Sequence, residues 1–155
     1  MSAQLIFDAA PLGALVRFSD GQPKPAPRFG RKLAAWEHKN SIGRLVRKEP
    51  ATRRGHHVTP ASITLHRGNF GCDGVVVVMA YMTYSVTSAL VFEIIERPVP
   101  GAVRVLHLFG AATELLCLAP DWSHAEAWLH ANPYRRAILE PVKTEDMPLT
   151  SSARP

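Results

Sequence analysis

Residues 75–92 read VVVVMAYMTYSVTSALVF, a run of 18 residues that contains no charged side chain. This length reaches the lower limit for a helix that spans a membrane. The composition favours a different structure, because valines begin the run and Tyr81, Thr83, Tyr84 and Thr87 follow them. Branched and aromatic side chains of this kind fit a pleated sheet better than a helix. We therefore predict β-strands here and expect no membrane partner.

Short apolar runs separated by turns continue on both sides of this stretch. The predicted strands lie at residues 61–67, 75–84, 86–96, 103–109, 113–118 and 137–142. Runs that follow one another this closely predict antiparallel pairing between neighbours in a meander. The valine-rich strands are apolar on both faces and are expected at the centre of the sheet.

Two segments have the periodicity of a helix. Residues 121–132 read DWSHAEAWLHAN, with apolar positions at helical spacing, Asp121 as a capping residue and a proline directly after the segment. Residues 31–40 place Leu33 and Trp36 on one face of a second helix. We predict an α+β fold, namely a mainly antiparallel sheet of about six to eight strands with one or two short amphipathic helices packed on it.

The N-terminal part of the chain is more broken. Gly43 follows the helix of residues 31–40 and is expected to stop it in a left-handed conformation. Other expectations here are strands at 4–8 and 14–19, a proline-rich connector at 22–27, a brief edge strand at 44–48 and a loop at 51–60.

The chain has the size and composition of one folded domain, with 155 residues of which 46% are hydrophobic and 20% charged. We assign this domain to residues 1–143 and expect 144–155 to form a flexible tail. Cys72 and Cys117 form no C-x-x-C pair, so no zinc or redox site is expected. The N-terminus lacks the basic start of a signal peptide, and we expect a cytoplasmic protein.

The charged residues are divided unequally along the chain. Residues 1–67 carry 12 Lys and Arg against 4 Asp and Glu, and the remainder carries 6 against 9. Such an excess attracts anionic partners, nucleic acid above all, unless it only keeps the surface solvated. The predicted nucleic-acid-binding residues are Lys24, Arg28, Arg31, Lys32, Lys39, Arg44, Arg47, Lys48, Arg53 and Arg54. The prediction depends on these side chains converging into one continuous surface that contacts phosphates.

Three rings within the basic region are candidates for stacking. Phe29, Trp36 or His57 could stack on an unpaired base beside the cations. Trp36 has a second interpretation, because it shares a helix face with Leu33 and so fits an anchor in the core.

Residues 55–60 read GHHVTP and are followed by His66 and Asn69. This pattern resembles the start of the histidine metal finger of HNH and GHH-type nucleases. The resemblance implies one histidine as general base and another that helps to hold a divalent ion at the leaving phosphate oxygen. The finger places its later ligands on a helix, whereas residues 61–67 alternate like a strand, so the chain departs from the pattern there.

We predict a small, basic, non-enzymatic accessory protein that binds nucleic acid or a nucleoprotein through its N-terminal region. One alternative is a protein-binding module or inhibitor that docks on an acidic protein, with apolar strands that could form a homodimer. The other is a metal-dependent nuclease that uses His56 and His57. The chain has no P-loop and no dinucleotide fingerprint, and we expect no cofactor.

Overall fold

The computed structural model describes residues 1–70 and 78–146. Within these residues the helices are α1 (Ala3–Ala9), α2 (Gly30–Lys39) and α3 (Trp122–Ala131), with a 3-10 turn η1 (Thr144–Asp146) near the end. The strands are β1 (Leu15–Ser19), β2 (Ser41–Glu49), β3 (Thr52–Arg54), β4 (His57–Thr59), β5 (Ser62–Phe70), β6 (Val78–Ser85), β7 (Val91–Glu96), β8 (Val103–Phe109), β9 (Ala112–Ala119) and β10 (Ala137–Pro141).

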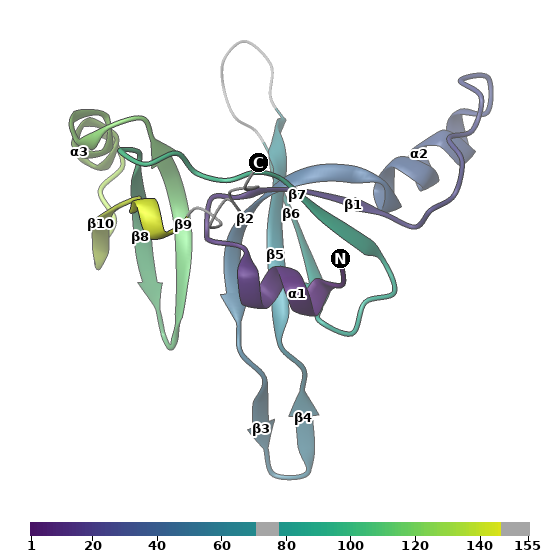
Figure 1. The fold of residues 1–155 in the computed structure, drawn as a ribbon, viewed down its shortest axis with the longest axis horizontal. Coiled ribbons are helices and arrows are strands. Elements are labelled where there is room, and N and C mark those ends of the chain that lie inside the picture. The colour runs from purple at the N-terminus through teal and green to yellow at the C-terminus, as the bar shows by residue number, and fades with distance from the viewer. Residues whose placement is uncertain (71–77, 147–155) are drawn as a thin grey trace, which may run out of the picture.

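Eight of these strands form one sheet in the order β10-β8-β9-β2-β1-β7, with β5 paired to β2 and β6 paired to β5. All the pairs are antiparallel, and α1 and α3 pack against the strands (Figure 1). The predicted fold class is therefore confirmed. The predicted meander holds for β5–β6 and β8–β9. It is wrong elsewhere, because β7 pairs with β1 and not with β6 or β8, and β10 pairs with β8 and not with the preceding β9.

Helix α1 lies where the sequence suggests a strand over residues 4–8. The hydroxyl of Ser2 accepts a hydrogen bond from the amide of Leu5 at 3.3 Å and so caps the first turn. Ala3 and Ile6, three positions apart, are both fully buried against the sheet. The strand prediction is wrong because the apolar residues form a helical stripe that covers β5 and β7.

Strand β2 lies inside the sheet and not at its edge as predicted for residues 44–48. It is bonded to β1, β5 and β9. Leu45 and Val46 are both buried and point to opposite faces, as successive residues of a strand do. Leu45 joins the core beneath α1, and Val46 packs with Leu106 and Leu115 on the other side. Both faces of β2 are covered, which makes it the strand that links two lobes.

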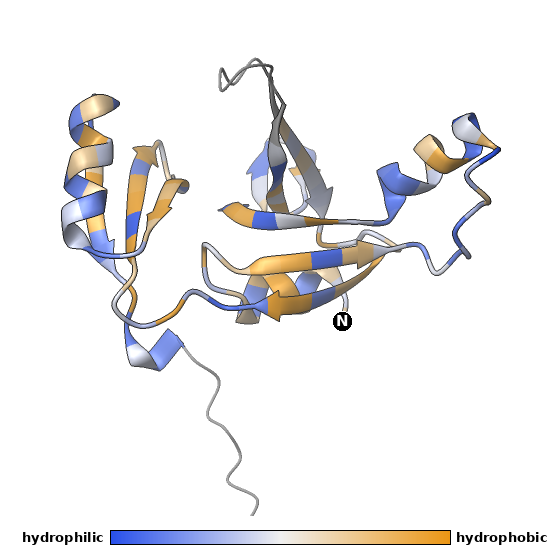
Figure 2. Cartoon of the chain, turned by 90° about the horizontal axis from the view of Figure 1, so that it is seen from above, coloured by the Kyte–Doolittle hydropathy of each residue, from blue (hydrophilic) through white to orange (hydrophobic). Residues whose placement is uncertain are grey.

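These two lobes are named here by their elements. The core lobe consists of α1, β1, β2, β5, β6 and β7, and the C-terminal lobe of β8, β9, β10 and α3. Figure 2 shows the C-terminal lobe at one end of the molecule and α2 at the other. Helix α3 begins as predicted, because the carboxylate of Asp121 accepts a hydrogen bond from the amide of His124 at 2.9 Å.

Arg104 on β8 connects the lobes and the end of the described chain. Its side chain donates to the carbonyl of Leu12 at 2.9 Å, to Glu140 at 3.0 Å and to Asp146 at 2.9 Å. The folded part of the chain therefore reaches Asp146 in η1, beyond the predicted domain end at residue 143. The rest of the predicted tail, residues 147–155, lies outside the described residues.

The uncharged run of residues 75–92 contains β-strands, as predicted. Residues 78–85 form β6 and Val91 begins β7, whereas residues 71–77 lie outside the described residues. Among the described strands β6 pairs with β5 alone, so this part of the run does not occupy the centre of the sheet as predicted. No helix in the described part of the chain is long and apolar enough to cross a membrane.

Two further predictions in the basic region are wrong. Gly43 does not stop a helix but lies within β2, opposite Val16 of β1. Residues 51–60 are not a loop but contain the hairpin of β3 and β4. Its two-residue turn begins at Gly55, whose φ of +60° suits the first position of a type II′ turn.

Candidate nucleic-acid interface

The largest group of predicted site residues lies on a projecting arm, defined here as residues 20–40, which comprises an extended connector and α2. Helix α2 forms as predicted, yet none of its residues is buried. It extends away from the sheet in both views (Figures 1 and 2). The expectation that it covers a face of the sheet is wrong, because Leu33 and Trp36 are only half-buried and the other positions are exposed.

A polar network closes the base of the arm. The amide of Asn40 donates to Asp20 at 2.8 Å and to the carbonyl of Trp36 at 2.9 Å, while it accepts from the hydroxyl of Ser19 at 2.6 Å. The hydrogen bond from Asn40 is the main reason that the pKa of Asp20 is lowered. The indole of Trp36 donates to the carbonyl of Gln22 at 2.7 Å, so Trp36 fastens the connector to α2 and belongs to none of the described core clusters.

The arm brings together five of the ten predicted residues, namely Lys24, Arg28, Arg31, Lys32 and Lys39. All five are exposed, and none forms an ion pair with a carboxylate within the described part of the chain. Two of them flank a ring: Arg28 lies 4.8 Å and Lys32 5.3 Å from the centre of Phe29. Phe29 itself is 43% exposed. The tip of the arm is therefore a cationic surface that contains an aromatic ring.

Three other predicted residues, all on β2, contribute to the fold. Arg44 donates to the carbonyl of Gly13 at 2.6 Å, and Lys48 donates to the carbonyl of Phe7 at 2.7 Å. Burial lowers the pKa of Lys48. Arg47 lies 3.5 Å from Glu49. Arg44 and Lys48 therefore bind neighbouring segments of the chain, Arg47 pairs within its own strand, and Arg44 also lines a cavity described below.

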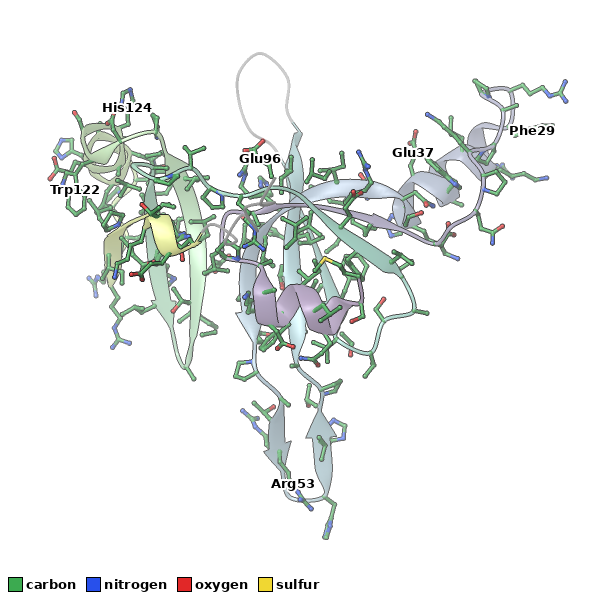
Figure 3. The ribbon with its side chains drawn as sticks, viewed as in Figure 1. Phe29, Glu37, Arg53, Glu96, Trp122 and His124 are labelled. Atoms are coloured by element: carbon green, nitrogen blue, oxygen red, sulfur yellow. The ribbon has the colours of Figure 1, made fainter. Side chains whose placement is uncertain are left out.

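The last two predicted residues, Arg53 and Arg54, are exposed on the β3–β4 hairpin. Figure 3 labels Arg53 at the end of this hairpin and Phe29 at the end of the arm, in different parts of the molecule. The ten cations therefore occupy three places and do not form one continuous surface.

The same hairpin carries His56 and His57, the residues of the nuclease resemblance. Strand β5 follows the hairpin, so the helix that a histidine metal finger needs is replaced by a strand. The described residues contain no group of three or more His, Cys, Asp or Glu side chains placed to hold a metal ion.

A cavity between the two lobes has no counterpart among the sequence predictions. It is lined by parts of β2, β5, β6, β9 and α3, has a volume of about 300 Å³ and is called the groove below. Arg44, His66 and Tyr81 lie next to one another in the strand register and so project from the same face. The sequence shows each residue in an alternating strand, but the register that aligns them is set by long-range pairing.

A family match to this chain spans the arm, the hairpin and the groove. Neither the curated proteins nor the solved structures contain a match to this chain. One family model, described as Uncharacterised conserved protein UCP036055, matches residues 1–146, which include every element of the described fold. The chain belongs to this family of uncharacterised conserved proteins.

Proposed function

We propose that this protein binds nucleic acid and that the arm is its interface. The observation that carries the proposal is the placement of five exposed cations and Phe29 on a segment whose helix buries no residue. Lys and Arg side chains in such positions donate charge-assisted hydrogen bonds to phosphate oxygens.

The stability of the fold does not account for this arrangement. A helix of ten residues is marginal on its own, and helices in proteins are held mainly by an apolar face that packs on a core. Exposed charges add little to stability, since ion pairs at the surface contribute at most about 1 kcal/mol. Selection for folding alone would therefore not be expected to gather cations on an unsupported helix, whereas selection for an anionic partner would.

The aromatic ring on the arm supports a nucleic acid over other anions. Arg28 and Lys32 lie 4.8 Å and 5.3 Å from the centre of the Phe29 ring, and Phe29 exposes 43% of its surface. Surfaces that bind single strands combine cations, which follow the backbone, with rings on which bases stack. An isolated phosphate or carboxylate would use the cations and leave the ring without a function.

The test compares two pairs of exposed cations. Arg31→Gln/Lys32→Gln removes two charges from the arm, and Arg53→Gln/Arg54→Gln removes two charges from the hairpin, so the two variants have the same net charge. Fluorescence polarisation measures their affinity for a labelled single strand and for a duplex at low salt. We expect the arm variant to bind at least about tenfold more weakly than the unmodified protein, and the hairpin variant to bind within about twofold of it.

Equal losses in the two variants, or a larger loss in the hairpin variant, would show that the arm is not the interface. An acidic protein is the competing partner, because it would meet the same cations. A partner protein that co-purifies after nuclease treatment, together with no detectable binding of either oligonucleotide at low salt, would replace the proposal by that alternative.

A further inference from the structure

The groove presents flat ring surfaces on both of its sides. On the core lobe the rings of His66 and Tyr81 lie 5.1 Å apart between their centres. On the C-terminal lobe Trp128 and Tyr134 are stacked, with ring centres 6.0 Å apart and planes inclined by 11°. His107 extends this second set, 5.7 Å from Tyr134. Of these rings His66, Tyr81 and Trp128 line the groove, so ring faces reach it from both lobes.

The groove is open enough to admit a planar group. Tyr81 and Tyr134 remain 45% and 48% exposed, and Trp128 and His66 are half-buried. The cavity of about 300 Å³ has the size of the smaller ligand pockets. Packing of the two lobes therefore leaves part of these ring faces accessible from the cavity.

The charges around the groove favour a neutral ring inside it, with the phosphate that carries the ring outside. Arg44 lies in the same row as His66 and Tyr81 and uses one of its five donors on the carbonyl of Gly13. Burial raises the pKa of Tyr81, and the nearby Glu114 raises it further, so the phenol stays neutral. A phosphate placed among these residues would meet Glu114, whereas a base would meet ring faces and a guanidinium.

Strand β2 connects the groove to the arm. Asn40 at the base of the arm precedes Arg44 by four residues, which is about 13 Å along a strand. Between them the guanidinium of Arg67 donates to the carbonyl of Glu37 in α2 and to the hydroxyl of Ser41, each at 3.2 Å. The arm and Arg44 of the groove are thus joined by a short length of β2, and Arg67 of β5 holds the end of α2 to the start of that strand.

We infer that the groove takes unpaired bases of a single-stranded nucleic acid whose phosphates are held by the arm. This inference rests on the proposed function. It adds that the nucleic acid is single-stranded and not a duplex. Stacking explains why rings of different types border one cavity, since every base offers a flat face. A duplex keeps its bases stacked on one another and has none to offer.

The test uses three labelled ligands of about 12 residues each, a length within the range that single-strand binding sites cover. They are an oligothymidylate, an abasic strand with the same phosphates, and a duplex. We expect the unmodified protein to bind the oligothymidylate about tenfold more tightly than either of the others. An abasic strand that binds equally well would overturn the inference and leave the arm proposal standing, whereas no binding of any ligand would overturn both.

Three variants test whether the bases contact the groove. Tyr81→Ala removes a ring from the groove, Tyr81→Phe keeps it, and Trp122→Ala removes a 47% exposed ring from the first turn of α3, which lies outside the groove. We expect Tyr81→Ala to lower the affinity for oligothymidylate about tenfold without changing that for the abasic strand. The other two variants are expected to bind like the unmodified protein.

Two results would contradict this assignment. Equal losses for both strands in Tyr81→Ala would mean that the ring acts through the fold, which circular dichroism of the variant would also reveal. Displacement of the oligothymidylate by an equal concentration of thymidine monophosphate would assign the groove to a free nucleotide instead.

Discussion

The guanidinium of Arg104 donates a hydrogen bond of 2.9 Å to the carboxylate of Asp146, 42 residues further along the chain. The arginine side chain is only 6% exposed, and it also binds Glu140 and the carbonyl of Leu12. One buried cation therefore joins β8, β10, η1 and the segment that leads into β1. These contacts fix the C-terminal lobe to the segment that precedes β1.

Arg104→Met is expected to lower the free energy of unfolding by about 2–3 kcal/mol. The methionine keeps the length of the side chain but leaves two carboxylates and a carbonyl without their donor. Glu140 and Asp146 are 47% and 31% exposed, so water partly replaces the lost contacts and the loss is smaller than for a fully buried pair. Urea denaturation provides the measurement.

The control for this prediction is Arg17→Met. Arg17 and Glu93 form a pair at 3.1 Å whose side chains are 54% and 63% exposed. We expect this change to cost no more than about 0.5 kcal/mol. Losses of the same size in the two variants would contradict the role given to Arg104.

Gly43→Ala is expected to destabilise the protein by about 1–3 kcal/mol. A Cβ at this position would lie 2.9 Å from the Cβ of Leu65 and 3.2 Å from the carbonyl oxygen of His66, so β2 and β5 would have to separate. Gly30→Ala in α2 is the matched control, because a Cβ there meets nothing within 4 Å and alanine favours a helix. A thermal unfolding midpoint for Gly43→Ala at or above that of Gly30→Ala would contradict the close approach.

The cap of α3 predicts a dependence of stability on pH. Hydrogen bonds from the backbone amide and the ring of His124 lower the pKa of Asp121 below its ordinary value of 3.8. Because this pKa is lower in the folded chain, the carboxylate stabilises the fold above about pH 3.8, and the effect is lost as the pH falls through the folded value. The stability difference between the unmodified protein and Asp121→Ala should therefore shrink on acidification.

Asp121→Asn separates titration from capping. Asparagine is as good a cap as aspartate but does not titrate in this range. Its advantage over Asp121→Ala should stay constant as the pH falls. A difference that shrinks equally in both comparisons would point to another acid-sensitive group.

The amides of α2 are expected to exchange with solvent much faster than those of β2 and β5. Exchange protection follows burial and tertiary packing, and α2 has no buried residue, whereas Leu45 and Leu65 are fully buried. Hydrogen exchange measured by mass spectrometry on the free protein checks this directly. Addition of an oligonucleotide should slow exchange over residues 30–39 and leave β3 and β4 unchanged.

Local signals were sufficient where the tertiary structure agrees with them. The start of α3 could be predicted because Asp121 caps its own helix and Pro133 ends it, with no help from distant residues. Strands β8 and β9 follow one another and pair, so their apolar runs indicated both extent and partner, whereas β10 returns after α3 to pair with β8. For α1, a run of six or seven residues fits either a helix or a strand. Burial against β5 and β7 selects the helix.

The position of a charge could not be predicted in the same way. Arg44 and Lys48 have the same residue types as the arm cations, yet carbonyls of Gly13 and Phe7, at least 31 positions away, accept their hydrogen bonds. A count of charges therefore overestimated how many of these cations gather on one surface. The groove was missed for a related reason, since its rings come from β5, β6 and α3 and meet only after the two lobes join.

The salt dependence of binding tests the central claim most directly, because it counts the phosphate contacts. Each contact with a single strand contributes a slope of about −0.7 to the logarithm of the affinity against the logarithm of the salt concentration. If all five arm cations bind phosphates, the slope is about −3.5, and Arg31→Gln/Lys32→Gln reduces it to about −2. A slope that Arg31→Gln/Lys32→Gln leaves unchanged, or that Arg53→Gln/Arg54→Gln reduces instead, would contradict binding through the arm.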